Sequence, residues 1–144
     1  ISAAQSHEGK NIKHDISVPI SRIGEFIEAA SRQLRQAYPD AQLIVFGHLG
    51  DGNLHFNVAP HARFAQRYDE AFAHDEARVN RLVHDLVAAY EGAISAEHGI
   101  GVLRQTELVR YKQPLELQMM RAIKQALDPL DRMNPGKLLP TPYT

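Results

Sequence analysis

The sequence contains no cysteine among its 144 residues, and it has no long hydrophobic run. Without cysteine there can be no disulfide bond or thiolate metal site, so a transition metal would have to be bound by His, Asp or Glu. The longest apolar run is far too short for a membrane-spanning helix, and the first ten residues lack the basic and apolar regions of a signal peptide. We therefore expect a protein that is cytoplasmic or bound peripherally to a membrane.

The sequence also lacks an excess of either charge. It has 16 basic and 17 acidic residues, which gives a formal net charge of -1. A nucleic-acid-binding surface requires a marked basic excess, so we expect no nucleic-acid partner. The apolar fraction of 44% is sufficient for a hydrophobic core, and the length suits a single domain over 1–144.

The hydrophobic periodicity predicts alternating strands and helices. The expected strands are 12–18, 41–49, 53–59 and 93–96, and the expected helices are 22–37, 69–90, 104–111 and 114–127. Ser21 is predicted to cap the first helix, and Gly92 to end the second as its C′ residue. The first six elements follow the order β-α-β-β-α-β of the ferredoxin-like split βαβ arrangement. We predict an α+β fold in which a four-stranded antiparallel sheet has both long helices on one face, with further helices at the C-terminus.

The stretch GHLGDGNLHFN, residues 47–57, predicts a hairpin with two histidines. If Asp51 and the following glycine form a two-residue turn, His48 lies directly opposite His55. Strand alternation then places Asn57 on the same face, and Lys13 on the corresponding face of the first strand. Two adjacent imidazoles could share a metal ion, although they could also belong to a surface hairpin and simply face water.

A third ligand is available in SAEHGIG, residues 95–101, where Glu97 precedes His98. In the ferredoxin-like order the last strand lies beside the first, so Glu97 can approach the region of His55. Two histidines and one carboxylate are typical of a catalytic metal with an open coordination position. Glu97 could instead be a solvated carboxylate, and His98 a packed or exposed side chain. Lys13 near such a site would suit an anionic substrate, but could equally be a solvated lysine.

Four motifs together resemble the C-terminal domain of the FAD-linked oxidase family. They are KHDISVPIS, FGHLGDGNLHFNV, ISAEHGIG and YKQPLELQMMRAIKQALDPLDRMNPGKLLP, and they cover nearly the whole chain in the family's order. The family includes D-lactate dehydrogenases, the glycolate oxidase FAD subunit and D-2-hydroxyglutarate dehydrogenase. The resemblance implies that a D-2-hydroxy acid is oxidised to the 2-oxo acid with FAD as cofactor. It also implies that a separate N-terminal domain, absent from this sequence, holds most of the flavin.

The resemblance assigns the histidine hairpin to a metal centre. It implies that His48, His55 and Glu97 bind a divalent ion, most simply zinc, with manganese, cobalt and iron as alternatives. It implies that His98 is the base that accepts the proton of the substrate hydroxyl. Such a centre would act on a small anionic 2-hydroxy acid.

The resemblance also assigns groups outside the metal ligands. Lys13 and Asn57 match positions that hold the substrate carboxylate and neighbouring oxygens, while Asn134 and Lys137 lie in the NPGK segment expected to approach the flavin. The expected partner is the flavin-binding domain of the same enzyme, and the open sheet face could also support a homodimer. No glycine-rich phosphate loop is present, so we expect this chain alone to be inactive. The electron acceptor is not indicated.

Two other classes of function remain compatible with the residues. Two histidines and a carboxylate also describe the non-haem Fe(II) oxygenase triad, although the predicted helices do not suit the usual β-barrel. A ferredoxin-like domain could also bind a metal or metabolite without catalysis. The EHGIG and MNPGKLL segments argue against such a simple binding module.

Overall fold

The structure is a computed structural model that describes residues 11–60 and 74–140. The chain divides into two compact units, Ile1–Glu97 and His98–Thr144. The elements of the first unit are β1 (Ile12–Ser17), the 3-10 helix η1 (Ile20–Arg22), α2 (Ile23–Ala37), β2 (Ala41–His48), β3 (Asn53–Pro60) and α4 (Glu76–Ala89). The second unit contains α5 (Gln105–Tyr111) and α6 (Pro114–Leu127). The part of the predicted helix 69–90 before residue 74 lies outside the described residues.

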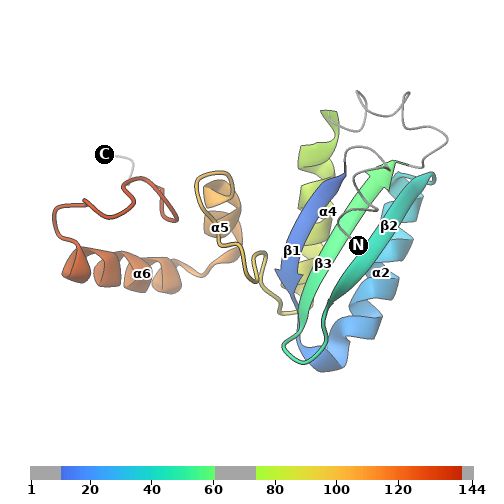
Figure 1. Ribbon diagram of the computed structural model, residues 1–144, viewed down its shortest axis with the longest axis horizontal. Helices are drawn as coiled ribbons and strands as arrows, with labels where there is room; N and C mark the ends of the chain where they lie inside the picture. The colour runs from blue at the N-terminus through green and yellow to red at the C-terminus, as the bar shows by residue number, and fades with distance from the viewer. Residues whose placement is uncertain (1–10, 61–73, 141–144) are drawn as a thin grey trace. The chain divides into compact units, whose positions relative to one another are not determined.

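The sheet of the first unit confirms the predicted α+β class. Its strands are antiparallel in the order β1-β3-β2 (Figure 1). The predicted fourth strand, 93–96, does lie antiparallel beside β1, but only as an isolated bridge between Ser17 and Ala93. The next hydrogen bond runs from the Ala96 N–H to the Asp15 carbonyl oxygen at 3.1 Å. From Ser17 to Asp15, β1 advances by two residues, whereas the opposite segment advances by three, from Ala93 to Ala96. The extra residue interrupts the ladder as a β-bulge does.

The helices α2 and α4 cover the same face of the sheet, as predicted (Figure 1). Alternation along the strands turns one set of side chains toward them, and this set is buried: Ile12, His14, Ile16, Leu54, Phe56 and Val58. The Phe26 ring from α2 meets the Phe56 ring edge-on, with their centroids 5.8 Å apart. Val79, Val83 and Val87 on α4 complete the core and are fully buried. The hydrophobic core thus fixes which face of the hairpin remains polar.

The start of α2 differs from the prediction. The helix begins at Ile23 after a 3-10 turn, and its N-cap is Arg22 without a side-chain cap. The Arg22 N–H donates to the Pro19 carbonyl at 2.8 Å, so Ser21 lies inside this turn and cannot act as the N-cap. The 3-10 turn that follows Pro19 therefore leads the chain into α2.

The end of α4 also differs from the prediction. The residue in the left-handed region is Glu91, with φ of 58°, and Gly92 follows it. The Gly92 N–H donates to the Val87 carbonyl at 2.8 Å, which makes Gly92 the C″ residue of a Schellman motif. A Cβ atom on Gly92 would lie 2.2 Å from the Ser17 carbonyl oxygen. Glycine is therefore required here for the close approach to β1.

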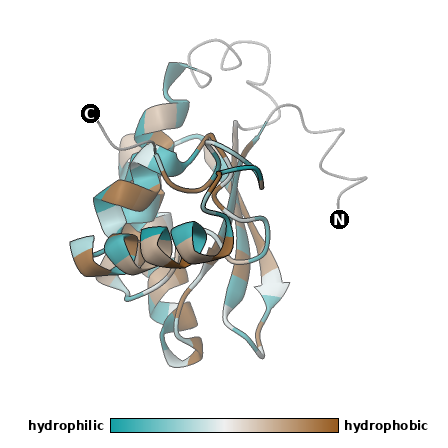
Figure 2. Ribbon diagram, turned by 90° about the vertical axis from the view of Figure 1, so that its left-hand side faces the viewer, coloured by the Kyte–Doolittle hydropathy of each residue, from teal (hydrophilic) through white to brown (hydrophobic). Residues whose placement is uncertain are grey.

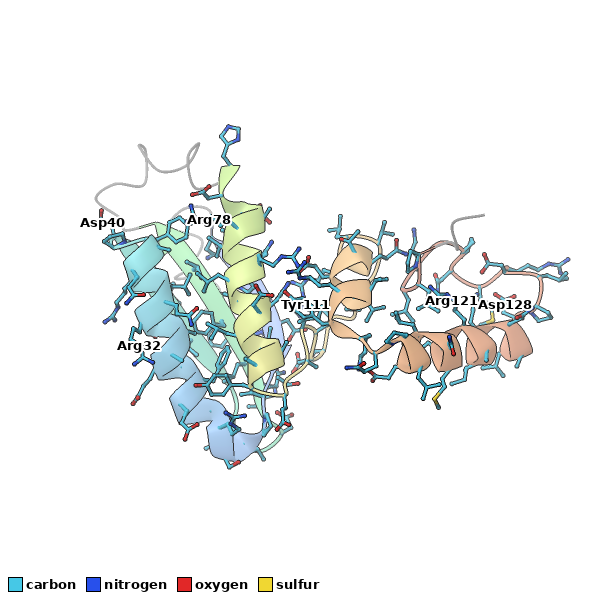
Figure 3. The ribbon with its side chains drawn as sticks, turned by 180° about the vertical axis from the view of Figure 1, so that it is seen from behind. Arg32, Asp40, Arg78, Tyr111, Arg121 and Asp128 are labelled. Atoms are coloured by element: carbon cyan, nitrogen blue, oxygen red, sulfur yellow. The ribbon has the colours of Figure 1, made fainter. Side chains whose placement is uncertain are left out.

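The second unit is a pair of helices followed by an irregular segment. At the start of α6, Gln113 and Glu116 form a reciprocal capping box around Pro114. Asp128 follows the end of α6 (Figure 3) and accepts hydrogen bonds from the N–H groups of Arg132 and Met133 at 2.9 and 2.7 Å. Hydrophobic and hydrophilic segments alternate along α6 (Figure 2). No helix among the described residues is long and apolar enough to cross a membrane.

Candidate functional site

The histidine hairpin has a register different from the predicted one. His48 pairs with Asn53, and Phe46 pairs with His55. The predicted direct opposition of His48 and His55 is therefore wrong by two residues. Because the side-chain period of a strand is also two, both imidazoles remain on the same face. They lie diagonally, with ring centroids 6.4 Å apart and planes nearly perpendicular.

The register shifts because the connection is a four-residue loop, 49–52, rather than a two-residue turn. The Asp51 carboxylate accepts the Asn53 N–H at 3.0 Å, which supplies a local alternative to strand pairing. The Gly52 carbonyl accepts the Val18 N–H at 3.1 Å, and Gly52 has φ of 77°. This hydrogen bond to the segment after β1 thus fixes the conformation of the loop 49–52.

On β1 and β3, the sheet face away from the helices carries polar side chains. Its register pairs between β1 and β3 are Lys13 with Asn57, Asp15 with His55, and Ser17 with Asn53. Asp15, Asn53 and Asn57 are each only 3% exposed, whereas Lys13 is exposed. The structure therefore places Lys13 and Asn57 opposite each other on the histidine face, as alternation predicted.

Glu97 reaches this face from the segment beside β1. Its N–H donates to Asp15 Oδ2 at 2.9 Å, and its carboxylate accepts a hydrogen bond from the side-chain amide of Asn53. Glu97 Oε1 lies 3.4 Å from His48 Nδ1. The carboxylate thus reaches the hairpin as expected, and it lies there beside His48.

His48, His55 and Glu97 offer a donor set that could hold a metal. Two ligands on one tetrahedral ion with bonds of about 2.0–2.1 Å lie about 3.3–3.4 Å apart. The separation of His48 Nδ1 and Glu97 Oε1 matches that value. The ligand atoms of all three residues do not come within 4.8 Å of one another. A shared ion would therefore require the His55 ring to turn toward the other two residues.

Sequence reasoning assigned no role to Asp15 or Asn53, which both contact Glu97. The only sequence signal was their position. Asp15 shares one face of the first strand with Lys13, and Asn53 begins the strand that carries His55. The contacts of both residues become visible only in the fold, because their partner Glu97 comes from a distant part of the chain. Asp51 also lies near a histidine of the hairpin, with Oδ2 3.9 Å from His48 Nδ1 in an exposed position.

The remaining predicted residues belong to the second unit. His98 is its first residue, follows Glu97 directly and is exposed. Asn134 and Lys137 are both exposed and lie in one turn, in which the Lys137 N–H donates to the Asn134 carbonyl at 3.2 Å. Asn134 has φ of 49°. These two side chains are therefore available to a ligand from the same short segment.

The fold and the polar face define an α+β domain that carries imidazole, carboxylate and ammonium groups on one side of a sheet. The chain belongs to the FAD linked oxidases, C-terminal domain family, whose model matches residues 1–138. The membership confirms the resemblance drawn from the four sequence motifs.

Curated relatives are named D-2-hydroxyglutarate dehydrogenase. The chain is 40% identical to the protein of Stutzerimonas stutzeri over 88% of the chain and 26% of that protein, and 41% identical to that of Xanthomonas citri pv. viticola over 90% and 27%. It is 37% identical to the mitochondrial enzyme of Bos taurus over 98% of the chain and 24% of that protein. The chain thus spans about a quarter of the length of the curated relatives that it matches.

Proposed function

We propose that the chain is the substrate- and metal-binding C-terminal domain of an FAD-dependent D-2-hydroxy acid dehydrogenase. Family membership and the names of its relatives favour D-2-hydroxyglutarate as substrate, with D-lactate and glycolate as alternatives. The observation that carries the proposal is the contact between Glu97 and His48 on the polar sheet face, 3.4 Å between ligand atoms. A purely structural sheet face has little need for a carboxylate between an imidazole and a buried amide.

The substrate carboxylate is proposed to bind between Lys13 and Asn57. These residues are register partners on β1 and β3, one residue pair along from Asp15 and His55 on the same face. The exposed Lys13 ammonium can pair with an anion, and the amide of Asn57 can donate to a neighbouring oxygen. A substrate with its carboxylate there would extend toward the histidines.

The proposed chemistry uses two further groups of residues. His48, His55 and Glu97 would hold a divalent metal, and Asn134 and Lys137 would face the flavin. When bound, the metal would supply Lewis-acid polarisation of a hydroxyl group, and the flavin would supply a hydride acceptor.

His98 is proposed to accept the proton of the substrate hydroxyl, which leaves the 2-oxo acid as product. As the residue directly after Glu97, it shares the backbone that reaches the polar face. Its exposed side chain can also return the proton to water.

Flavin reduction in single turnovers tests this proposal. The full-length enzyme, with its flavin-binding domain and bound flavin, is mixed with D-2-hydroxyglutarate, L-2-hydroxyglutarate, D-lactate or glycolate, and bleaching of the flavin absorbance is followed. We expect reduction by a D-hydroxy acid or glycolate, and a loss of about 10²–10⁴-fold in its rate for His98→Ala. His74→Ala is the matched control, since His74 is exposed and outside the site. No reduction by any of these acids would contradict the proposal.

A further inference from the structure

Asp15 is a buried carboxylate at the centre of the polar sheet face. It is 3% exposed and lies in register with His55 on the neighbouring strand. An ionised carboxylate is costly to bury unless polar partners surround it. Because Asp15 is buried on the side of the sheet away from α2 and α4, the polar groups around it must offset the cost of burying its charge.

The two oxygens of Asp15 face two different residues of the proposed metal centre. Oδ2 accepts the backbone N–H of Glu97 at 2.9 Å. Oδ1 lies 4.0 Å from His55 Nδ1. The backbone carbonyl of Asp15 also accepts the N–H of Ala96 at 3.1 Å, so the side chain and main chain of one residue both hold the segment that carries Glu97.

The contact with His55 bears on which ring nitrogen carries a proton. At 4.0 Å the pair is an electrostatic contact rather than a hydrogen bond, and its attraction favours a proton on Nδ1. A neutral imidazole protonated on Nδ1 leaves the lone pair of Nε2 available to a metal. A carboxylate behind a histidine is a common arrangement for fixing its tautomer and ring orientation.

We propose that Asp15 is a positioning residue that selects the Nδ1–H tautomer of His55 and fixes the backbone of Glu97 at the same time. The proposal rests on the metal centre proposed above, and it assigns the second ligand atom to His55 Nε2. It also explains why the sheet tolerates a buried carboxylate beside the interrupted ladder. One residue thereby couples two ligands that lie far apart in the sequence.

The substitution Asp15→Asn separates the two roles. The amide keeps an oxygen that can accept the Glu97 N–H, but the partial positive charge of its NH₂ group then faces His55 Nδ1 in place of the negative carboxylate oxygen. This arrangement favours the proton on Nε2 and blocks the proposed ligand atom. We expect the zinc dissociation constant, measured by competition with a chromophoric chelator, to rise by about 10–100-fold. The control Glu28→Gln changes an exposed carboxylate on α2, outside the site, and we expect less than a twofold change.

The outcomes distinguish this proposal from the proposed metal centre itself. If the unmodified protein binds zinc, the double variant His48→Ala/His55→Ala does not, and Asp15→Asn binds as tightly as the unmodified protein, the role of Asp15 is refuted while the metal centre stands. If the double variant retains zinc affinity, the metal centre fails. An equal loss of zinc affinity in Glu28→Gln would also refute the role of Asp15, because the effect would then not depend on the position of the carboxylate.

A second measurement does not depend on the folding of the variant. Long-range ¹⁵N–¹H correlation of the histidine rings reports the tautomer of His55 in the metal-free, unmodified protein. We expect the Nδ1–H form, and in a folded Asp15→Asn variant a shift to the Nε2–H form. An Nε2–H tautomer in the unmodified protein would overturn the proposal, because a merely structural role of Asp15 would not require either form.

Discussion

Gly47 is the residue whose replacement tests the hairpin geometry most severely. A Cβ atom at this position would lie 2.1 Å from the Asn53 carbonyl oxygen and 3.0 Å from Leu54 Cα. Both contacts are with the backbone of β3, so no side-chain rotation can relieve them. The substitution Gly47→Ala must therefore move the strands apart by roughly 1 Å to reach ordinary van der Waals contact. We expect the free energy of unfolding to fall by about 1–3 kcal/mol.

Urea unfolding followed by circular dichroism measures this loss. The matched control is Gly24→Ala in α2, because no atom lies within 4 Å of a Cβ placed there. Alanine is the better helix former, so Gly24→Ala should leave stability unchanged or raise it by up to about 1 kcal/mol. Equal stability of Gly47→Ala and the unmodified protein would refute the observed register, because the pairing of His48 with Asn53 brings the two strands this close.

Three further predictions concern the core, the site and the second unit. Phe56→Ala removes a fully buried ring, and we expect urea unfolding to show a loss of about 3–5 kcal/mol; less than 1 kcal/mol would contradict the packing against α2 and α4. Asn53→Ala removes the amide that donates to Glu97, and we expect a loss of about 1–3 kcal/mol and weaker zinc binding; unchanged values of both would exclude this contact. The pKa of Asp128 is lowered from 3.8 to about 2, chiefly by the hydrogen bond from Lys124 and further by backbone N–H groups. Because the folded pKa is the lower one, its stabilisation is present above about pH 4 and is lost as the pH falls toward 2. Carboxyl chemical shifts recorded against pH should show this low midpoint, and a midpoint near 4 would contradict the contacts.

The strand faces could be predicted from the sequence because alternation has a fixed period of two. That period places Lys13 and Asn57 with the histidines whatever the loop length, provided that any register shift is even. The observed shift is two, so the composition of the face was predicted correctly although the pairing of His48 with His55 was not. The helices were predictable for a similar reason, since their apolar spacing is long and regular.

The pairing itself could not be predicted because long-range hydrogen bonds determine it. The loop 49–52 is held by the Val18 N–H, which reaches the hairpin only after the chain has folded. The bulge between Ala93 and Ala96 likewise decides how far along the sheet Glu97 arrives. Asp15 remained unassigned because its role depends on that arrival. Local patterns therefore identified the face, and tertiary contacts arranged the residues on it.

A zinc titration tests the proposed metal centre most directly. Metal-free protein is titrated with zinc, and the stoichiometry and affinity are compared among the unmodified chain, the double variant His48→Ala/His55→Ala and the control His74→Ala. We predict that the unmodified chain and the control each bind one zinc ion with the same affinity, and that the double variant loses this binding. Zinc binding that survives in the double variant, or is absent from the unmodified protein, would contradict a metal centre on the histidine hairpin.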